Sequence, residues 1–244
     1  TGHPRDLTLV HALGIGNGKG SGIGRFAHES MVRRVIGGHW TWSPSMQKLA
    51  QDNKIEAYSF PAGVIQTLFR EIGSKRPGVI TKIGLGTFID PKNDGGKCNS
   101  LTKEDLVENI ILNGETHLWY KPFKIDIAII RGSAVDINGN ITNQSEPADL
   151  DAFSVALAAH NCGGKVFVQV GKILDKPICP SRLVNIPGIL IDGVVINKNQ
   201  MQTSTGKYDP RLSGEILPPK DIFVGELPDG IRNLICQRAL KELE

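Results

Sequence analysis

The residues with the clearest chemical potential lie between positions 14 and 24, where every second residue is glycine. The segment reads GIGNGKGSGIG and follows a short apolar run. Because glycine lacks a Cβ, such a backbone can approach a ligand closely and offer its N–H groups to an anion. A simple turn requires one or two glycines, so the six glycines of this loop indicate ligand binding where a strand connects to the next element.

One interpretation of this glycine loop is a nicotinamide cofactor site. The run NGKGSGIGR resembles the cofactor loop of short-chain dehydrogenases, and Tyr120 and Lys124 have the spacing of the Tyr–Lys pair in those enzymes. However, Pro122 separates the two residues where a hairpin is expected to end, so they do not share a helical face. Glu56 lies near the beginning of the second strand, whereas a ribose-binding carboxylate belongs at its end. An NAD(P)-dependent dehydrogenase is therefore a weak alternative.

The composition favours a soluble, folded protein that acts on a small molecule. The 244 residues are 40% hydrophobic, and 28 basic against 25 acidic residues give a net charge of +3. This balance does not indicate a nucleic-acid or membrane-surface partner, and no apolar run approaches the roughly 18 residues that a membrane-spanning helix requires. The four cysteines form no C-x-x-C pair, so we expect no metal centre and a reducing, cytoplasmic compartment.

Short β-branched runs alternate with segments of helical period, which predicts an α/β fold with an open, largely parallel sheet. The expected strands are Leu7–Ala12, Ile55–Ser59, Val79–Ile83, Asp126–Ile130, Lys165–Val170 and Ile189–Ile196. The expected helices are Phe26–Ile36, Pro44–Gln51, Val64–Ile72, Asp149–Asn161 and Gly230–Leu243. Asn113-Gly114 between two apolar runs predicts an antiparallel hairpin. We expect one domain over residues 1–196, followed by a linker arm and helix over 197–244.

Blocks of sequence along the whole chain carry a resemblance to a known family. They are GHPRDLT at 2–8, the glycine loop, AHE at 27–29, GGHW at 37–40, GTFIDP at 86–91, GGK at 95–97, IRG at 130–132 and GNIT at 139–142. In this order they closely resemble the family I coenzyme A transferases, and among them the single-chain acetate or propionate CoA-transferases.

The resemblance implies helices on both faces of the sheet and an activity that moves CoA between an acyl-CoA and a short-chain carboxylate. In this family a glutamate attacks the thioester, and a glutamyl-CoA thioester is the intermediate. No acidic residue here stands in the family's nucleophile context. We therefore expect no catalytic residue within this chain and the glutamate nucleophile beyond Glu244.

The chain accordingly resembles a first half that lacks the initial βα unit and the glutamate-bearing second half. CoA is then a substrate, and no cofactor is bound permanently. The expected partners are the second half and further copies in a homo-oligomer. The apolar side of the terminal helix, which leads into that half, should be exposed.

The resemblance also implies a substrate site made of backbone groups. The loops at the carboxyl ends of parallel strands should gather along one edge and face the second half. The residues expected to bind substrate are Gly16, Asn17, Gly18, Ala62, Gly63, Gly84, Gly86 and Thr87. Ala62 stands where many relatives have glutamine, so a side-chain donor near the acyl oxygen is missing.

Several polar residues have simpler structural interpretations. We expect His39 and Trp40 to pack rather than to line an acyl pocket, and Lys97 to be solvated rather than to bind a CoA phosphate. Glu29 is expected to stabilise a helix N-terminus. The alternative function for the whole chain is a non-catalytic domain that binds acyl-CoA or an oligomer partner.

Overall fold

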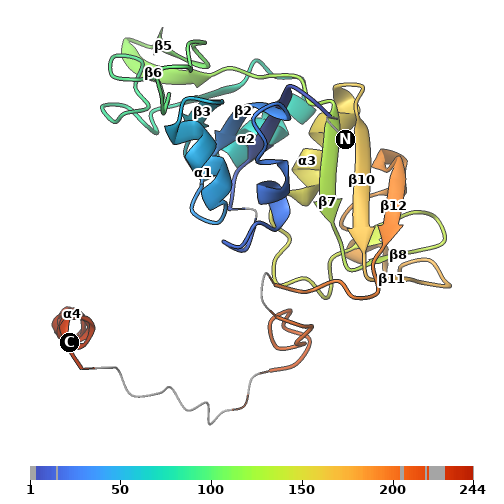
Figure 1. Cartoon of the computed structure of the whole chain (residues 1–244). Helices are drawn as coiled ribbons and strands as arrows, with labels where there is room; N and C mark the ends of the chain where they lie inside the picture. Colours follow the sequence, from blue (N-terminus) through green and yellow to red (C-terminus); the bar gives the residue numbers. More distant parts are fainter. Residues whose placement is uncertain (1–3, 15, 204–205, 218, 220–228, 244) are drawn as a thin grey trace.

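The computed structural model describes residues 4–14, 16–203, 206–217, 219 and 229–243. Within these residues, four α-helices accompany four three-stranded sheets, two of which are parallel (Figure 1). The parallel sheets have the orders β1-β2-β3 and β12-β10-β7. Their strands are β1 (Leu7–His11), β2 (Val32–Gly37), β3 (Glu56–Ser59), β7 (Ile127–Arg131), β10 (Lys165–Val170) and β12 (Gly193–Ile196). The predicted α/β class is confirmed, with the parallel strands divided between two sheets.

Helices cover both faces of the β1-β2-β3 sheet. α1 (Pro44–Gln51) shares a core cluster with Val35, whereas α2 (Ala62–Gly73) shares a second cluster with Ile36 and Tyr58. Val35 and Ile36 are neighbours on β2 and therefore point to opposite faces of the sheet. The expected arrangement, with helices on both faces, is confirmed for this sheet.

The second parallel sheet has one covered and one open face. α3 (Ala152–Asn161) packs against β7 and β10 and also lies along α2, so it joins the two sheets (Figure 1). Ala128 and Val166 are buried beneath it, while Ile129 and Phe167 point to the opposite face and are exposed. This alternation is the period of two expected for strands with one face in the core.

The predicted hairpin is confirmed and extends into a third sheet. β5 (Val107–Leu112) and β6 (Glu115–Tyr120) pair across Asn113 and Gly114, whose φ values of +51° and +78° suit a type I′ turn. β4 (Val79–Thr81) pairs antiparallel with β6, so the expectation that Val79–Ile83 is a parallel strand is wrong. The remaining elements are a small sheet and three 3-10 helices. The strands are β8 (Ala134–Val135), β9 (Ile141–Thr142) and β11 (Lys172–Ile173), and the 3-10 helices are η1 (Gly22–Phe26), η2 (Ser181–Leu183) and η3 (Gly188–Leu190).

The predicted helix Phe26–Ile36 is wrong, because its second half, from Val32 onward, is the central strand β2 of the first sheet. The buried hydrophobic residues of β2 are Val32, Val35 and Ile36, while Arg33 is exposed. This i, i+3, i+4 spacing of apolar residues is the pattern of a helix rather than the alternation of a strand. Glu29 consequently lies at no helix N-terminus, and its carboxylate is 3.0 Å from Lys54 Nζ.

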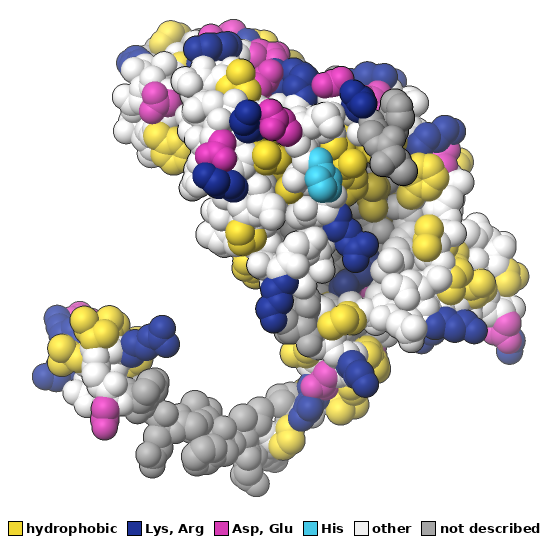
Figure 2. Space-filling view, in the orientation of Figure 1, with side chains coloured by type: hydrophobic (Ala, Val, Ile, Leu, Met, Phe, Trp, Pro, Cys, Tyr) yellow, Lys and Arg dark blue, Asp and Glu magenta, His cyan; other side chains and the backbone are white. Residues whose placement is uncertain are grey.

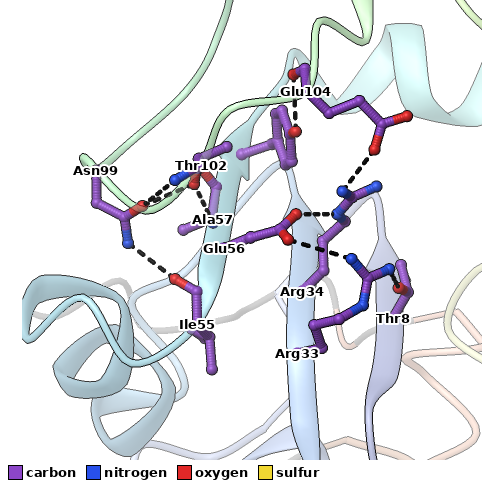
Figure 3. Close-up of polar contacts among 10 residues, drawn as sticks. Thr8, Arg33, Arg34, Ile55, Glu56, Ala57, Asn99, Thr102 and Glu104 are labelled. Atoms are coloured by element: carbon purple, nitrogen blue, oxygen red, sulfur yellow. Dashed lines mark hydrogen bonds and ion pairs between the residues drawn. The ribbon is translucent and has the colours of Figure 1, made fainter.

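A polar cluster fixes the loop that follows residue 98 to the first sheet. Figure 3 shows Arg34 of β2 between two carboxylates, with Nε 2.5 Å from Glu56 and Nη2 2.5 Å from Glu104. The Thr102 hydroxyl accepts a hydrogen bond of 2.7 Å from the N–H of Ala57 in β3. Arg34 is largely buried, so this cluster holds the loop against β2 and β3 rather than presenting charge to a ligand.

The segment after β12 is attached to the second sheet by Arg131, the last residue of β7. Its Nη1 and Nη2 donate hydrogen bonds of 2.8 Å to the carbonyls of Met201 and Gln202. Nε donates to the buried Glu146 carboxylate at 2.8 Å, and Gln200 donates to the same carboxylate at 3.2 Å. The beginning of the predicted arm is therefore held in place by a charged network.

α4 (Ile231–Leu240) forms the predicted terminal helix and lies apart from the rest of the described chain in Figure 1. Its apolar side chains are exposed as expected; they are Ile231, Leu234, Ile235, Leu240 and the following Leu243. No described helix is both long and apolar enough to cross a membrane. Elsewhere on the face seen in Figure 2, Lys and Arg side chains are interspersed with Asp and Glu.

Candidate functional site

The connections that leave the carboxyl ends of β1, β2 and β3 touch one another. The N–H of Gly38 donates to the His11 carbonyl at 3.1 Å. A Cβ on Gly38 would lie 2.2 Å from the carbonyl oxygen of Ala12 and 3.0 Å from the Cα of Ala62. Glycine is therefore required at position 38, because only its small size lets the glycine loop, the β2 connection and the start of α2 meet.

The glycine loop packs tightly against the connection that follows β2. A Cβ on Gly14 would lie 2.5 Å from Nδ1 of His39, and a Cβ on Gly16 would lie 2.5 Å from the carbonyl oxygen of Trp42. The N–H of Gly18 donates to the same carbonyl at 2.9 Å. Alternate glycines thus serve close packing against His39 and Trp42, a reason that the sequence pattern alone does not reveal.

The tip of the glycine loop is open, and some of its N–H groups form hydrogen bonds within the loop. The Asn17 side-chain oxygen accepts hydrogen bonds from the N–H groups of Lys19 and Ser21, at 2.9 and 3.2 Å. Gly18 and Gly20 have φ values of +72° and +87°, and a Cβ on either would meet nothing within 4 Å. The side-chain oxygen of Asn17 thus orders the loop, while open space remains next to the two glycines. Substrate contact by Gly16, Asn17 and Gly18 stays a prediction.

His11, at the end of β1, is a buried residue that the sequence did not single out. Burial lowers its pKa below the usual histidine range, so the ring is neutral at neutral pH. Its Nδ1 lies 2.7 Å from the Leu13 carbonyl, which can only accept, so Nδ1 carries the proton. The ring contacts Trp40 edge-on at 6.3 Å, and a Cβ on Gly37 would lie 2.8 Å from Nε2. His11 and Trp40 therefore pack beneath the site, as expected for Trp40.

Ala62 and Gly63 form the first turn of α2. The first N–H groups of a helix have no partner within the helix and carry the positive end of its dipole. A Cβ on Gly63 would meet nothing within 4 Å, and Gly63 lines a hollow of about 210 Å³ together with Gln66, Thr67 and residues that precede and begin α3. The backbone of this turn is therefore accessible to a ligand.

The third predicted loop, Gly84–Thr87, follows β4 rather than a parallel strand. A Cβ on Gly84 would lie 2.7 Å from the hydroxyl of Tyr120, whose ring packs on Phe60 at 5.5 Å. The loop therefore approaches the β3 connection through these two rings, and whether it borders the same substrate space stays a prediction.

Hydrogen bonds within the Gly84–Thr87 loop use its polar groups. The Thr87 hydroxyl donates to the Gly84 carbonyl at 2.7 Å, and the N–H of Gly86 donates to the buried Asp90 carboxylate at 3.0 Å. Hydrogen bonds from the N–H groups of Gly86 and Lys92 lower the pKa of Asp90. Gly86 and Thr87 thus stabilise the loop, and their contact with substrate stays a prediction.

Three other residues considered from the sequence have structural partners. Lys97 borders a polar hollow of about 460 Å³ beside β3, but its Nζ lies 2.5 Å from the Asp105 carboxylate, so it is not the solvated side chain that we expected. Tyr120 is fully buried, burial raises its pKa to about 12, and its hydroxyl donates to the Ile83 carbonyl. Lys124 is exposed and its Nζ lies 2.6 Å from Asp126. Tyr120 and Lys124 therefore form no dehydrogenase pair.

The catalytic glutamate is expected beyond Glu244, the last residue of the sequence. Glu244, beyond which we expect the catalytic glutamate, lies outside the residues that the structure describes. The described residues therefore do not test where the nucleophile lies, and its position beyond Glu244 stays a prediction.

Comparison with known proteins identifies the family. The coenzyme A transferase family model matches residues 3–197. The chain belongs to the coenzyme A transferase family. It is 42% identical to caffeate CoA-transferase of Acetobacterium woodii, over 100% of this chain and 47% of that protein. It is 38% identical to acetate CoA-transferase YdiF of Escherichia coli (strain K12), over 98% of this chain and 45% of that protein.

The fold agrees with solved structures of the family. The thioester complex of acyl-CoA transferase YdiF from E. coli O157:H7 with CoA superposes with a TM-score of 0.92 at 38% identity, covering 99% of this chain and 48% of that chain. Glutaconate CoA-transferase from Acidaminococcus fermentans shares the fold alone, with a TM-score of 0.60 at 16% identity over 79% of this chain and 62% of that chain. The chain spans about half the length of the first curated relatives it matches.

Proposed function

We propose that the complete protein transfers CoA between an acyl-CoA and a short-chain carboxylate such as acetate or propionate, and that this chain supplies one wall of the active site. The observation that supports the proposal is the match of the whole chain to an acetate and a caffeate CoA-transferase. The touching connections at the carboxyl ends of β1, β2 and β3 agree with it, because ligands of open α/β sheets bind at such edges.

The proposed chemistry proceeds through two acyl transfers. A glutamate carboxylate, which the family resemblance places beyond Glu244, attacks the thioester carbonyl and expels CoA thiolate, which leaves an acyl-glutamyl anhydride. The thiolate then attacks the glutamyl carbonyl, which releases the carboxylate product and forms a glutamyl-CoA thioester. A second carboxylate takes CoA by the reverse of these two steps, so no net oxidant, reductant or water is consumed.

The role of this chain in that chemistry is to hold developing negative charge and to exclude water. The N–H groups of Ala62 and Gly63 lie at the positive end of α2 and are suited to an oxyanion or carboxylate. Ala62 carries no amide, so these backbone donors replace the side-chain donor that glutamine would provide. Gly18, at the open tip of the glycine loop, borders the same edge. CoA is a substrate in this scheme, with no permanently bound cofactor.

The partner that completes the site is a glutamate-bearing half, in the same polypeptide or in a second subunit. Relatives of two kinds support this proposal. The caffeate and acetate CoA-transferases are about twice as long as this chain. The chain is also 28% identical to a protein named acetoacetyl-CoA:acetate/butyrate CoA transferase alpha subunit from Clostridium acetobutylicum, over 72% of each. A homo-oligomer and a cytoplasmic location are further parts of the proposal, the latter supported by four cysteines that are free of disulfides.

The test is a transfer assay on the protein encoded by the complete gene, together with any subunit encoded beside it. Propionyl-CoA is incubated with isotope-labelled acetate, and acetyl-CoA, propionate and free CoA are quantified. We expect labelled acetyl-CoA and propionate in equal amounts with little free CoA. Release of free CoA would identify a hydrolase instead, and binding of acyl-CoA without turnover would support the non-catalytic alternative.

A further inference from the structure

Trp42 combines a fixed position with a large exposed surface. Half of the residue is accessible, at 49%. Its backbone is held on two sides: the N–H of Ser43 donates to the Trp40 carbonyl at 3.1 Å, and the N–H of Gly18 donates to the Trp42 carbonyl at 2.9 Å. A large apolar side chain that is exposed on a well-ordered backbone is a feature of binding sites more than of ordinary surfaces.

The indole ring also contacts a neighbouring aromatic side chain. The His39 imidazole contacts it edge-on, with ring centroids 5.5 Å apart and planes at 80°. Nε2 of His39 lies 2.9 Å from the hydroxyl of Thr41, which fixes the imidazole in turn. A Cβ on Gly14 would lie 3.1 Å from Cε3 of Trp42, so the glycine loop leaves room for the ring. The orientation of the indole is therefore set before any ligand binds.

Trp42 lies against the glycine loop, at the edge where the proposed function places the reacting groups. Leu13, which precedes the first glycine of the loop, is 39% exposed. The loop backbone lies directly against the connection that follows β2 and contains Trp42, with contacts at Gly14, Gly16 and Gly18. An acyl chain that extends away from a thioester held at this edge would therefore meet an aromatic surface before it met solvent.

We propose that Trp42, supported by His39 and Gly14, is the acyl-recognition surface of this enzyme and selects planar aromatic or conjugated acyl groups over acetyl. This inference rests on the proposed function. An aromatic acyl group stacks on an indole in an offset or edge-on arrangement and gains free energy beyond the burial of its area, whereas acetyl is too small to cover the ring. Trp42 is a specificity residue in this account, and the chemistry itself remains with other groups.

The experiment compares two acyl donors in the complete protein, with acetyl-CoA and cinnamoyl-CoA each tested against propionate as acceptor. Trp42→Leu keeps an apolar side chain but removes the aromatic surface, and Trp42→Phe keeps a smaller ring. Trp119→Leu is the matched control, because Trp119 lies on β6 in the antiparallel sheet. Thermal unfolding of each variant establishes that it is folded.

We expect Trp42→Leu to lower kcat/KM for cinnamoyl-CoA about tenfold and that for acetyl-CoA less than about twofold, since stacking and lost area are confined to the larger group. Trp42→Phe should lower the cinnamoyl-to-acetyl ratio about two- to threefold, and it carries the test if Trp42→Leu does not fold. Trp119→Leu should leave the ratio unchanged.

Two results would overturn the inference while leaving the proposed function intact. One is an unchanged ratio in both Trp42 variants, and the other is an equal loss with both donors, which would assign Trp42 to contact with the other half of the protein. A wild-type protein that transfers CoA to no carboxylate would instead refute the proposed function, and the inference would fall with it.

Discussion

Replacement of Arg131 by Met should release the segment that follows β12. Arg131 donates hydrogen bonds to the carbonyls of Met201 and Gln202, and it pairs with Glu146 through Nε and Nη2. Methionine preserves much of the length of the side chain but provides no donor. The variant therefore leaves a buried carboxylate uncompensated and two carbonyls of the segment without their partner.

The magnitude follows from the burial of the pair. The Glu146 side chain is only 8% exposed, while that of Arg131 is 37% exposed. Loss of one partner of a fully buried pair typically costs about 3–5 kcal/mol. Because water reaches Arg131 and Gln200 still donates to Glu146, we expect a loss of about 2 kcal/mol in the free energy of unfolding. In a protein of this size that corresponds to a melting temperature lower by about 4–8 °C.

The assay combines thermal unfolding with limited trypsin digestion. Trypsin cleaves after Lys207 and Arg211, both exposed in the segment that Arg131 attaches, so cleavage there should accelerate in Arg131→Met. Lys124→Met is the control: it removes the same charge from a pair with Asp126 that is exposed on both sides, so neither quantity should change. Equal melting temperatures and equal cleavage rates in the two variants would refute the reasoning.

Three further predictions concern Gly38, Gly63 and the buried tyrosines. Gly38→Ala should destabilise the protein by about 1–3 kcal/mol in urea unfolding, because its Cβ would lie 2.2 Å from the Ala12 carbonyl oxygen. Gly63→Ala, whose Cβ meets nothing within 4 Å in α2, should stabilise the fold by about 0.5–1 kcal/mol. The variant keeps the backbone N–H but places a methyl group in the open space beside it, so transfer activity should fall; full activity would show that substrate does not occupy this space. Burial raises the pKa of Tyr58 and of Tyr120 to about 12. Their contribution to the free energy of unfolding is therefore complete below the tyrosine pKa of about 10 in the unfolded chain, and it is lost as pH rises towards 12. The phenolate absorbance of Tyr58 and Tyr120 should then appear together with loss of helical circular dichroism, whereas Tyr208 is exposed. Ionisation of all three tyrosines in the folded protein near pH 10 would show the burial of Tyr58 and Tyr120 to be wrong.

Local sequence signals identified most elements, because each depends on neighbouring residues. Pro44 begins α1 as predicted, and Asn113-Gly114 forms the expected hairpin turn. The predicted end of α3 at Asn161 is confirmed, and Gly163 just beyond it has φ +75° and donates its N–H to the His160 carbonyl. β2 is predicted as a helix because its apolar residues Val32, Val35 and Ile36 have helical spacing. The pairing of Val79–Thr81 depends on β6, about forty residues away in sequence, and no local signal reports such a pairing.

The candidate site could likewise be predicted only in part from local sequence signals. The excess of glycine correctly marked a place where backbones approach closely, but part of that approach is to His39 and Trp42 rather than to a ligand. Gly86 looked like a free backbone donor, yet its N–H is used by Asp90, four residues further along. Sequence alone distinguishes neither case, because both uses of glycine require the same absence of a side chain. The neutral, buried His11 carried no sequence signal at all.

The central claim, that this chain is half of a transferase that forms a glutamyl-CoA thioester, is tested most directly by intact-mass spectrometry. The complete protein and residues 1–244 alone are each incubated with acetyl-CoA, and a parallel sample is then treated with excess acetate. We predict that the complete protein gains the mass of CoA less one water, on a single glutamate beyond Glu244, and loses it on treatment with acetate. Residues 1–244 alone should gain nothing. A stoichiometric CoA adduct on a carboxylate within residues 1–244, or none on the complete protein, would contradict the claim.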